Sequence, residues 1–188
     1  MKKIKEYKSV MNDKVGIRIN GNESYKNIEK NELDEIIKEI KKINFNRYPD
    51  DESLNLRKAY AEVVGIGEEN VIAGNGSDEM ISLIINYQIT KKKVVLTINP
   101  DFSMYDFYTS LNEGVVKKYN TENDGSFSVD RFIEYGRKVN PNLIIFSNPN
   151  NPTGHVISND EIIFILEAFK DILIVVDEAY YEFYGQGM

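Results

Sequence analysis

Polar residues follow four short apolar segments of the sequence, each of strand length. In an open α/β sheet the carboxyl ends of parallel strands meet at one edge, and ligands bind beyond that edge. We therefore expect these polar residues to form a single site. The polar segments are residues 74–79, 99–105, 147–154 and 177–180, which follow the apolar runs 71–73, 94–98, 143–146 and 172–176.

Asp177 is the sharpest of these signals, because it ends a run of five apolar residues. An unpaired carboxylate at such a position would be costly. One interpretation is a strand-end aspartate that caps a turn. The other is a carboxylate paired with a buried cation, such as the protonated ring nitrogen of a cofactor, where pairing keeps both groups charged.

A glycine-rich turn, residues 74–79, precedes a predicted helix. Free N–H groups and the helix dipole favour a phosphate at such a position. Asp78 and Glu79 also complement that dipole, so the helix could equally need no ligand. Two standard nucleotide motifs fail here, since Glu79 stands at the third glycine of the dinucleotide fingerprint and no phosphate-loop motif is present.

Residues 148–154 are dense in turn-forming asparagine, proline and glycine. This composition is typical of a tight surface loop. Asn151 nevertheless follows closely on a predicted buried strand, so its amide could reach the site as a fixed donor.

Composition excludes several other kinds of chemistry. The 188 residues carry a net charge of −7, which argues against the basic surface of a nucleic-acid binder. The chain has no cysteine and one histidine, so it has no disulfide or thiol nucleophile, and we predict neither a Ser-His-Asp triad nor a metal site. It shows no secretory signal and no apolar run long enough to span a membrane, so we expect a cytoplasmic protein.

Helical and strand patterns alternate along the chain and predict a three-layer α/β fold. The expected sheet is mostly parallel, with helices on both faces. Continuous apolar character over residues 172–176 predicts a strand buried on both sides. Apolar stripes predict helices over residues 33–40, 56–63 and 80–87, with further helices over 129–138 and from a Ser158/Glu161 capping box to Phe169. We expect residues 1–30 to form an N-terminal arm and residues 31–188 a cofactor-binding large domain that is incomplete.

Two motifs, in this order and spacing, resemble fold-type I pyridoxal-phosphate-dependent aminotransferases of class I/II. The similarity extends over nearly the whole chain, and the histidinol-phosphate aminotransferase subgroup is the most similar. The motifs are Asn148-Pro149-Asn150-Asn151-Pro152-Thr153-Gly154 and, 23 residues after Gly154, Asp177-Glu178-Ala179-Tyr180; subgroup motifs match at Asn20-x-Asn22-Glu23, Arg47-Tyr48-Pro49-Asp50 and Gly76-Ser77-Asp78-Glu79.

The resemblance implies which residues contact the cofactor, pyridoxal 5′-phosphate. Asp177 would pair with the protonated pyridine nitrogen. Asn151 and Tyr180 would hydrogen-bond the phenolic oxygen of the ring. Tyr105 would stack on the ring face, although spacing alone also allows a core aromatic at this position.

The resemblance also implies a phosphate site and a homodimer. Gly76, Ser77 and Asp78 would lie at the cofactor phosphate, with backbone N–H groups and the Ser77 hydroxyl as donors. Tyr48 would reach the phosphate of the cofactor in the partner subunit, which makes the dimer part of the site.

The implied reaction is amino-group transfer from an amino donor to a 2-oxo acid, with histidinol phosphate and 2-oxoglutarate as the expected pair. Asn22 and Glu23 would lie near the substrate. Other class I/II aminotransferases, aromatic or aspartate, and a threonine-phosphate decarboxylase-like enzyme remain open. So does an unrelated α/β nucleotide-binding module, although both nucleotide motifs fail.

The lysine that forms the Schiff base in this family lies beyond the Asp-Glu-Ala-Tyr motif. Eight residues follow Tyr180, none of them lysine, and all eighteen lysines precede Asp177. The chain thus resembles the N-terminal half of an aminotransferase and has no predicted catalytic residue. A further hypothesis is therefore an inactive fragment that binds the cofactor non-covalently or only self-associates.

Overall fold

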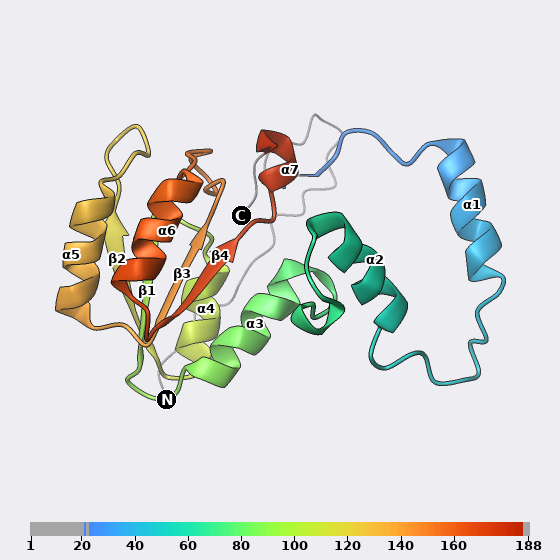
Figure 1. The fold of residues 1–188 in the computed structure, drawn as a ribbon, viewed down its shortest axis with the longest axis horizontal. Helices are drawn as coiled ribbons and strands as arrows, with labels where there is room; N and C mark the ends of the chain where they lie inside the picture. The colour runs from blue at the N-terminus through green and yellow to red at the C-terminus, as the bar shows by residue number, and fades with distance from the viewer. Residues whose placement is uncertain (1–20, 22, 186–188) are drawn as a thin grey trace, which may run out of the picture. The chain divides into compact units, whose positions relative to one another are not determined.

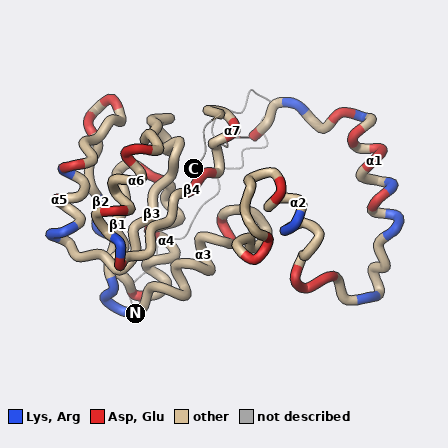
Figure 2. The backbone as a smooth tube through the Cα atoms, in the orientation of Figure 1, with Lys and Arg blue, Asp and Glu red and all other residues tan. Residues whose placement is uncertain are grey.

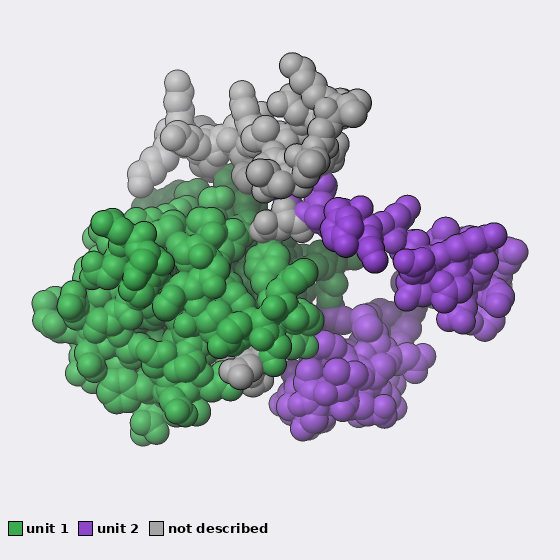
Figure 3. All heavy atoms as spheres, turned by 90° about the horizontal axis from the view of Figure 1, so that it is seen from above, with its two compact units in different colours: residues 1–7, 74–188 green, residues 8–73 purple. Residues whose placement is uncertain are grey.

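The computed structural model describes residue 21 and residues 23–185. The chain divides into two compact units, one of residues 1–7 and 74–188 and one of residues 8–73 (Figure 3). The first unit contains the β-sheet and five of the seven described α-helices. The expected boundary between an arm and a large domain at residue 30 stays a prediction.

Four parallel strands form the sheet of the larger unit (Figure 1). Their order is β2-β1-β3-β4, so the chain moves outward from β1 in one direction and from β3 in the other. The strands are β1 (Val94–Asn99), β2 (Val115–Asn120), β3 (Leu143–Ser147) and β4 (Leu173–Asp177).

Helices cover both faces of this sheet, which confirms the predicted three-layer architecture. Successive side chains on a strand point to opposite faces. Leu96 and Ile144 therefore pack with α5 (Val129–Val139) and α6 (Asn159–Ala168). On the other face, Val95 and Ile145 pack with α3 (Gly76–Gln88) and α4 (Met104–Leu111). The central strands β1 and β3 contain no charged residue (Figure 2).

Most predicted elements are confirmed. The helix α6 begins at the predicted capping box, in which the Ser158 hydroxyl accepts from the N–H of Glu161 and the Glu161 carboxylate accepts from the N–H of Ser158. The apolar stripe at residues 33–40 lies on α1 (Lys30–Ile40), and the stripe at 56–63 lies on α2 (Leu54–Val64).

Two expectations of the sequence need correction, and two helices were not predicted. Residues 71–73 follow the 3₁₀ turn η1 (Glu68–Asn70) but form no strand. The strand β4 is not buried on both faces, because it is an edge strand of the described sheet and its residues are half-exposed or exposed. Helix α4 and the short α7 (Tyr181–Tyr184) were not predicted.

Within its described residues, the unit of residues 8–73 contains α1, α2 and η1. Helix α1 carries both acidic and basic residues (Figure 2) and buries none of its residues. The guanidinium of Arg57 on α2 donates to the carbonyl oxygen of Glu68 at 2.8 Å and ties α2 to η1. Within the described residues 21 and 23–29 no helix or strand occurs, and residues 1–20 of the expected arm lie outside the described residues.

A substitution of Phe132 on α5 tests the packing of the core between this helix and the sheet. The Phe132 ring is fully buried and contacts Phe146 of β3 edge-on, with ring centroids 6.3 Å apart. We expect Phe132→Ala to lower the free energy of unfolding by about 3–5 kcal/mol, because the truncation leaves a cavity between helix and sheet. Phe45→Ala, at a side chain that is 79% exposed, should change it by less than about 0.5 kcal/mol. Equal losses in urea titrations of the two variants would contradict this core assignment.

Candidate functional site

The site lies at the carboxyl edge of the sheet, between β1 and β3. The chain leaves these two strands in opposite directions, which makes this the topological switch point where open α/β sheets bind ligands. The ladder between β1 and β3 contains only the pairs Val95–Leu143 and Leu96–Ile144, whereas β3 pairs with β4 at five positions. The strands β1 and β3 thus share no ladder with each other at the edge where their polar residues begin.

Asp177 is the last residue of β4 and has both carboxylate oxygens engaged. Oδ2 accepts from the hydroxyl of Tyr105 at 2.8 Å, and Oδ1 accepts from the N–H of Ala179 at 3.1 Å. These two bonds fix the rotation of the carboxylate. A carboxylate offers about four acceptor positions, so Asp177 can take a further donor.

Asp101 is a second carboxylate at this edge, two residues after β1. Its oxygens accept from the N–H of Phe102 at 2.7 Å, from both the hydroxyl and the N–H of Ser147, and from the hydroxyl of Thr97 at 3.4 Å. Burial raises the pKa of Asp101 to about 6, against the opposing effect of these hydrogen bonds, and the nearby charge of Asp177 contributes to the rise.

Tyr105 does not present an open ring face, which corrects the stacking role expected for it. The side chain is 0% exposed and belongs to the core between α4 and the sheet, so the alternative of a core aromatic holds. Burial and the carboxylates of Asp101 and Asp177 raise the pKa of Tyr105 far above its ordinary value. The hydroxyl therefore stays protonated and donates to Asp177. Phe102 packs edge-on against Tyr105, with ring centroids 5.7 Å apart, and keeps part of its own ring exposed.

Buried amides shape the loop after β3. The Asn148 amide pairs with the backbone of Ile157, accepting from its N–H at 2.8 Å and donating to its carbonyl at 3.0 Å. The Asn150 side chain accepts from the hydroxyl of Thr153 at 2.7 Å. The N–H of Asn151 donates to the Ser147 hydroxyl at 2.9 Å. The side-chain amide of Asn151 has no hydrogen-bond partner within residues 23–185, so it is available to a ligand.

Gly76, Ser77 and Asp78 form the first turn of α3, where backbone N–H groups have no intrahelical partner. Gly76 has φ +81°, a conformation that favours glycine, and the space a Cβ would take is open. The hydroxyl of Tyr108 on α4 donates to Asp78 at 2.9 Å. This bond ties the start of α3 to the helix that carries Tyr105.

The remaining predicted residues are placed as follows. Tyr180 is half-buried and stands at the N-cap position of α7, three residues after Asp177. Tyr48 lies between α1 and α2 with a fully exposed side chain, and Glu23 is exposed before α1. Asn22 lies outside the described residues. The structure thus joins Tyr105 directly to Asp177, and the roles of Tyr48, Asn22 and Glu23 stay predictions.

The charges at the edge fit a cationic ligand group. Asp101 and Asp177 approach one another, and among the described residues neither forms an ion pair with a lysine or arginine. Two neighbouring carboxylates favour the charged form of a bound cation. The protonated ring nitrogen of pyridoxal 5′-phosphate has this character, and the open turn at Gly76 suits its phosphate. In the described part of the chain no group of three histidine, cysteine, aspartate or glutamate residues could hold a metal ion.

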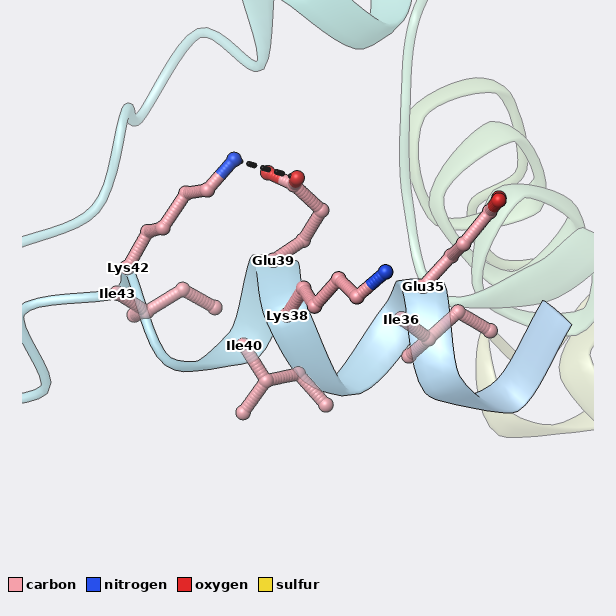
Figure 4. A pocket seen from close by; sticks show the side chains of 7 residues that line it. All are labelled: Glu35, Ile36, Lys38, Glu39, Ile40, Lys42 and Ile43. Carbon is pink, nitrogen blue, oxygen red and sulfur yellow. Dashed lines mark hydrogen bonds and ion pairs between the residues drawn. The ribbon is translucent and has the colours of Figure 1, made fainter. Parts of the chain in front are cut away.

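A hollow on α1 is different in character. Ile36 and Ile40 on α1 and Ile43 just after the helix line this hollow, and Lys42 pairs with Glu39 (Figure 4). The isoleucines are 45–55% exposed. This is an exposed apolar helix face without converging donors. No helix within the described residues is long and apolar enough to cross a membrane.

The sequence did not single out Asp101, Ser147, Phe102 or Tyr108. A signal was available for Asp101, because it comes shortly after the apolar run 94–98, as Asp177 comes after the apolar run 172–176. Nothing in the spacing of Ser147 or Tyr108 reveals the partners across the sheet edge.

A family model described as "Aminotransferase class I and II" matches residues 14–188. The chain belongs to the class I and II aminotransferase family. This confirms the resemblance seen in the motifs. A relative named histidinol-phosphate aminotransferase, from Clostridium novyi, is 41% identical over 189 residues, covering 100% of this chain and 53% of its own length. This aminotransferase chain thus spans about half the length of the curated relatives it matches.

Solved structures of aminotransferases agree with the fold. The histidinol-phosphate aminotransferase from Clostridium acetobutylicum matches with a TM-score of 0.72 and 27% identity, over 85% of this chain and 46% of its own. The enzyme from Sinorhizobium meliloti, solved in complex with pyridoxal-5′-phosphate, matches with a TM-score of 0.73 and 22% identity, over 80% and 40%. The second likeness shows the fold alone.

Asp101 makes the stability of this aminotransferase chain depend on pH. Its pKa is raised from 3.8 to about 6, so the folded chain holds the proton more tightly than the unfolded chain. The free energy of unfolding contributed by this group is therefore lost as pH rises from about 4 to 7, by about 2 kcal/mol. We expect the difference between wild type and Asp101→Asn in urea titrations to fall by that amount over this range. A difference independent of pH would contradict the assignment.

Proposed function

We propose that the carboxyl edge of β1, β3 and β4 binds pyridoxal 5′-phosphate and serves amino-group transfer. The observation that carries this proposal is Asp177, a strand-end carboxylate oriented by Tyr105 and Ala179 next to a second carboxylate and without a protein cation within the described residues. A turn suited to phosphate, at Gly76, belongs to the same unit.

When bound, the cofactor supplies an electron sink that weakens the bonds next to the amino nitrogen of a substrate. Asp177 would hold the proton on the ring nitrogen. The protonated Tyr105 hydroxyl would keep the Asp177 carboxylate in place. Asn151 and Tyr180 would contact the phenolic oxygen, and Phe102 offers the exposed aromatic surface that Tyr105 lacks. The N–H groups of Ser77 and Asp78 would bind the phosphate beside Gly76, whose own N–H donates to the carbonyl oxygen of Gly74 at 3.1 Å. The Tyr108–Asp78 bond would position that turn.

We propose histidinol phosphate as the amino donor and 2-oxoglutarate as the acceptor. The support is the 41% identity to a relative of that name over the whole of this chain. Asn22 and Glu23 would lie near that substrate. Other amino donors, aromatic or aspartate, and phosphothreonine decarboxylation use the same cofactor and are distinguished by assays with each substrate.

The covalent step needs a lysine, and none follows Asp177 in these 188 residues. Transamination is therefore proposed for a polypeptide that supplies such a lysine. For the 188 residues themselves we propose non-covalent cofactor binding.

We also propose a homodimer in which Tyr48 contacts the cofactor of the partner subunit. Tyr48 is fully exposed, and α1 presents the apolar face of Ile36, Ile40 and Ile43 to solvent. A second subunit would cover such surfaces.

Equilibrium dialysis tests the proposal with pyridoxine 5′-phosphate, which has no aldehyde and so forms no Schiff base with surface lysines. We expect the wild-type chain to bind it and Asp177→Asn to bind at least about tenfold more weakly, because an amide cannot pair with the ring cation; tenfold corresponds to about 1.4 kcal/mol.

The matched control is Asp171→Asn, an exposed aspartate just before β4, which should bind like wild type. Pyridoxine without the phosphate should bind much more weakly if the α3 turn holds the phosphate. Binding of ATP or NAD in place of pyridoxine 5′-phosphate would replace the proposal with a nucleotide-binding function.

A further inference from the structure

We propose that Asp101 is a positioning residue that sets the Asn150–Asn151 turn against the cofactor site through Ser147. The inference rests on the proposed function for its ligand, but its geometry stands on the described residues alone.

The first observation is the opening between β1 and β3. Their ladder ends at Leu96 and Ile144, so no backbone hydrogen bond of the ladder joins the ends of the two strands. Asp101 crosses this opening. Its carboxylate accepts from both the N–H and the hydroxyl of Ser147, the last residue of β3. The Asp101 side chain thus provides the N–H of Ser147 with an acceptor where the ladder between β1 and β3 has ended.

The second observation is what the Ser147 hydroxyl does next. It donates to Asp101 and accepts from the N–H of Asn151 at 2.9 Å and from the side-chain amide of Asn150 at 3.3 Å. Ser147 is 2% exposed, so water cannot easily replace these bonds. Because the Ser147 hydroxyl donates its proton to Asp101, the lone pairs of its oxygen face the Asn150–Asn151 turn.

The third observation is that an amide cannot replace Asp101. All four groups around its carboxylate are donors: the N–H groups of Phe102 and Ser147 and the hydroxyls of Thr97 and Ser147. Asparagine would place an NH₂ against two of these donors. The hydroxyls of Thr97 and Ser147 would then turn away, and the Asn151 N–H would lose its fixed acceptor.

Hydrogen exchange of the unliganded chain tests this positioning. We expect Asp101→Asn to accelerate exchange of the Asn151 amide about tenfold or more relative to amides in the centre of β3. Asp106→Asn is the matched control, because Asp106 lies on α4 and pairs with Lys118 away from this network. Unchanged exchange at Asn151 in Asp101→Asn would overturn the proposal.

Ligand binding supplies the second readout. We expect Asp101→Asn and Ser147→Ala each to weaken binding of pyridoxine 5′-phosphate at least about fivefold. The double variant should bind little more weakly than either single variant, since both substitutions break the same hydrogen-bonded chain from Asp101 through Ser147 to Asn151. The effect should shrink for the 3-deoxy analogue, which lacks the oxygen that Asn151 would contact. A general loss of structure would weaken both ligands equally and would overturn the positioning role.

The two proposals fail in different ways. If the wild-type chain binds no pyridoxine 5′-phosphate, the proposed function is wrong, and hydrogen exchange alone decides whether Asp101 positions Asn151. If Asp101→Asn does not fold, Ser147→Ala keeps the binding test decisive. Equal effects of Ser147→Ala on the binding of pyridoxine 5′-phosphate and of its 3-deoxy analogue would then contradict the proposed positioning of Asn151 through Ser147.

Discussion

Two strands of one parallel sheet part before their ends, and the candidate site depends on how that opening is bridged. Only two residue pairs join β1 to β3, so beyond Leu96 and Ile144 no ladder joins the sides of these two strands that face each other. Buried polar groups without partners are costly. The Asp101 carboxylate supplies a partner instead, because it accepts from the N–H of Ser147 across the opening. The same opening is the place where an α/β sheet can admit a ligand.

The charge of the site follows from this arrangement. A carboxylate is well suited to gather several donors at the end of β1, and β4 delivers a second carboxylate, Asp177, to the same edge. The Tyr105 hydroxyl donates to Asp177 from the core and remains protonated. Two carboxylates bonded only to neutral donors, among the described residues, leave the edge negative. A ligand with a protonated ring nitrogen compensates that charge, which a neutral or anionic ring would not do.

The sequence predicted the layers of the fold because long amphipathic helices and uncharged strands carry strong patterns. It predicted the edge of the sheet as the site because Asp177 and Asn151 follow apolar runs. It did not predict α4, whose aromatic residues lack a clear stripe, and it misjudged residues 71–73, whose apolar run has no strand beside it. The burial of β4 was overestimated, since composition does not reveal whether a strand lies at the centre or at an edge.

The tertiary partners were beyond reach of local patterns. Tyr105 was expected on the ring face from the family resemblance, with a core aromatic as the alternative. As the second residue of α4, it is buried in the core. The pairs Asp101–Ser147 and Tyr108–Asp78 join residues 46 and 30 positions apart and depend on strand order and helix packing. The motifs indicated the class I and II aminotransferase family, and the match of the family model confirms it. The hydrogen bonds that hold those motifs in place are visible only in the structure.

The central claim is that Asp177 holds a cationic ring nitrogen at this edge. Nitrogen NMR of pyridoxine 5′-phosphate labelled with ¹⁵N in the ring tests it directly, at a pH where the free ligand has lost its ring proton. The account predicts that the bound ring nitrogen shows the chemical shift of a protonated pyridine in the wild-type chain and of a neutral pyridine in Asp177→Asn. A neutral-type shift for the ligand bound to the wild-type chain would contradict it.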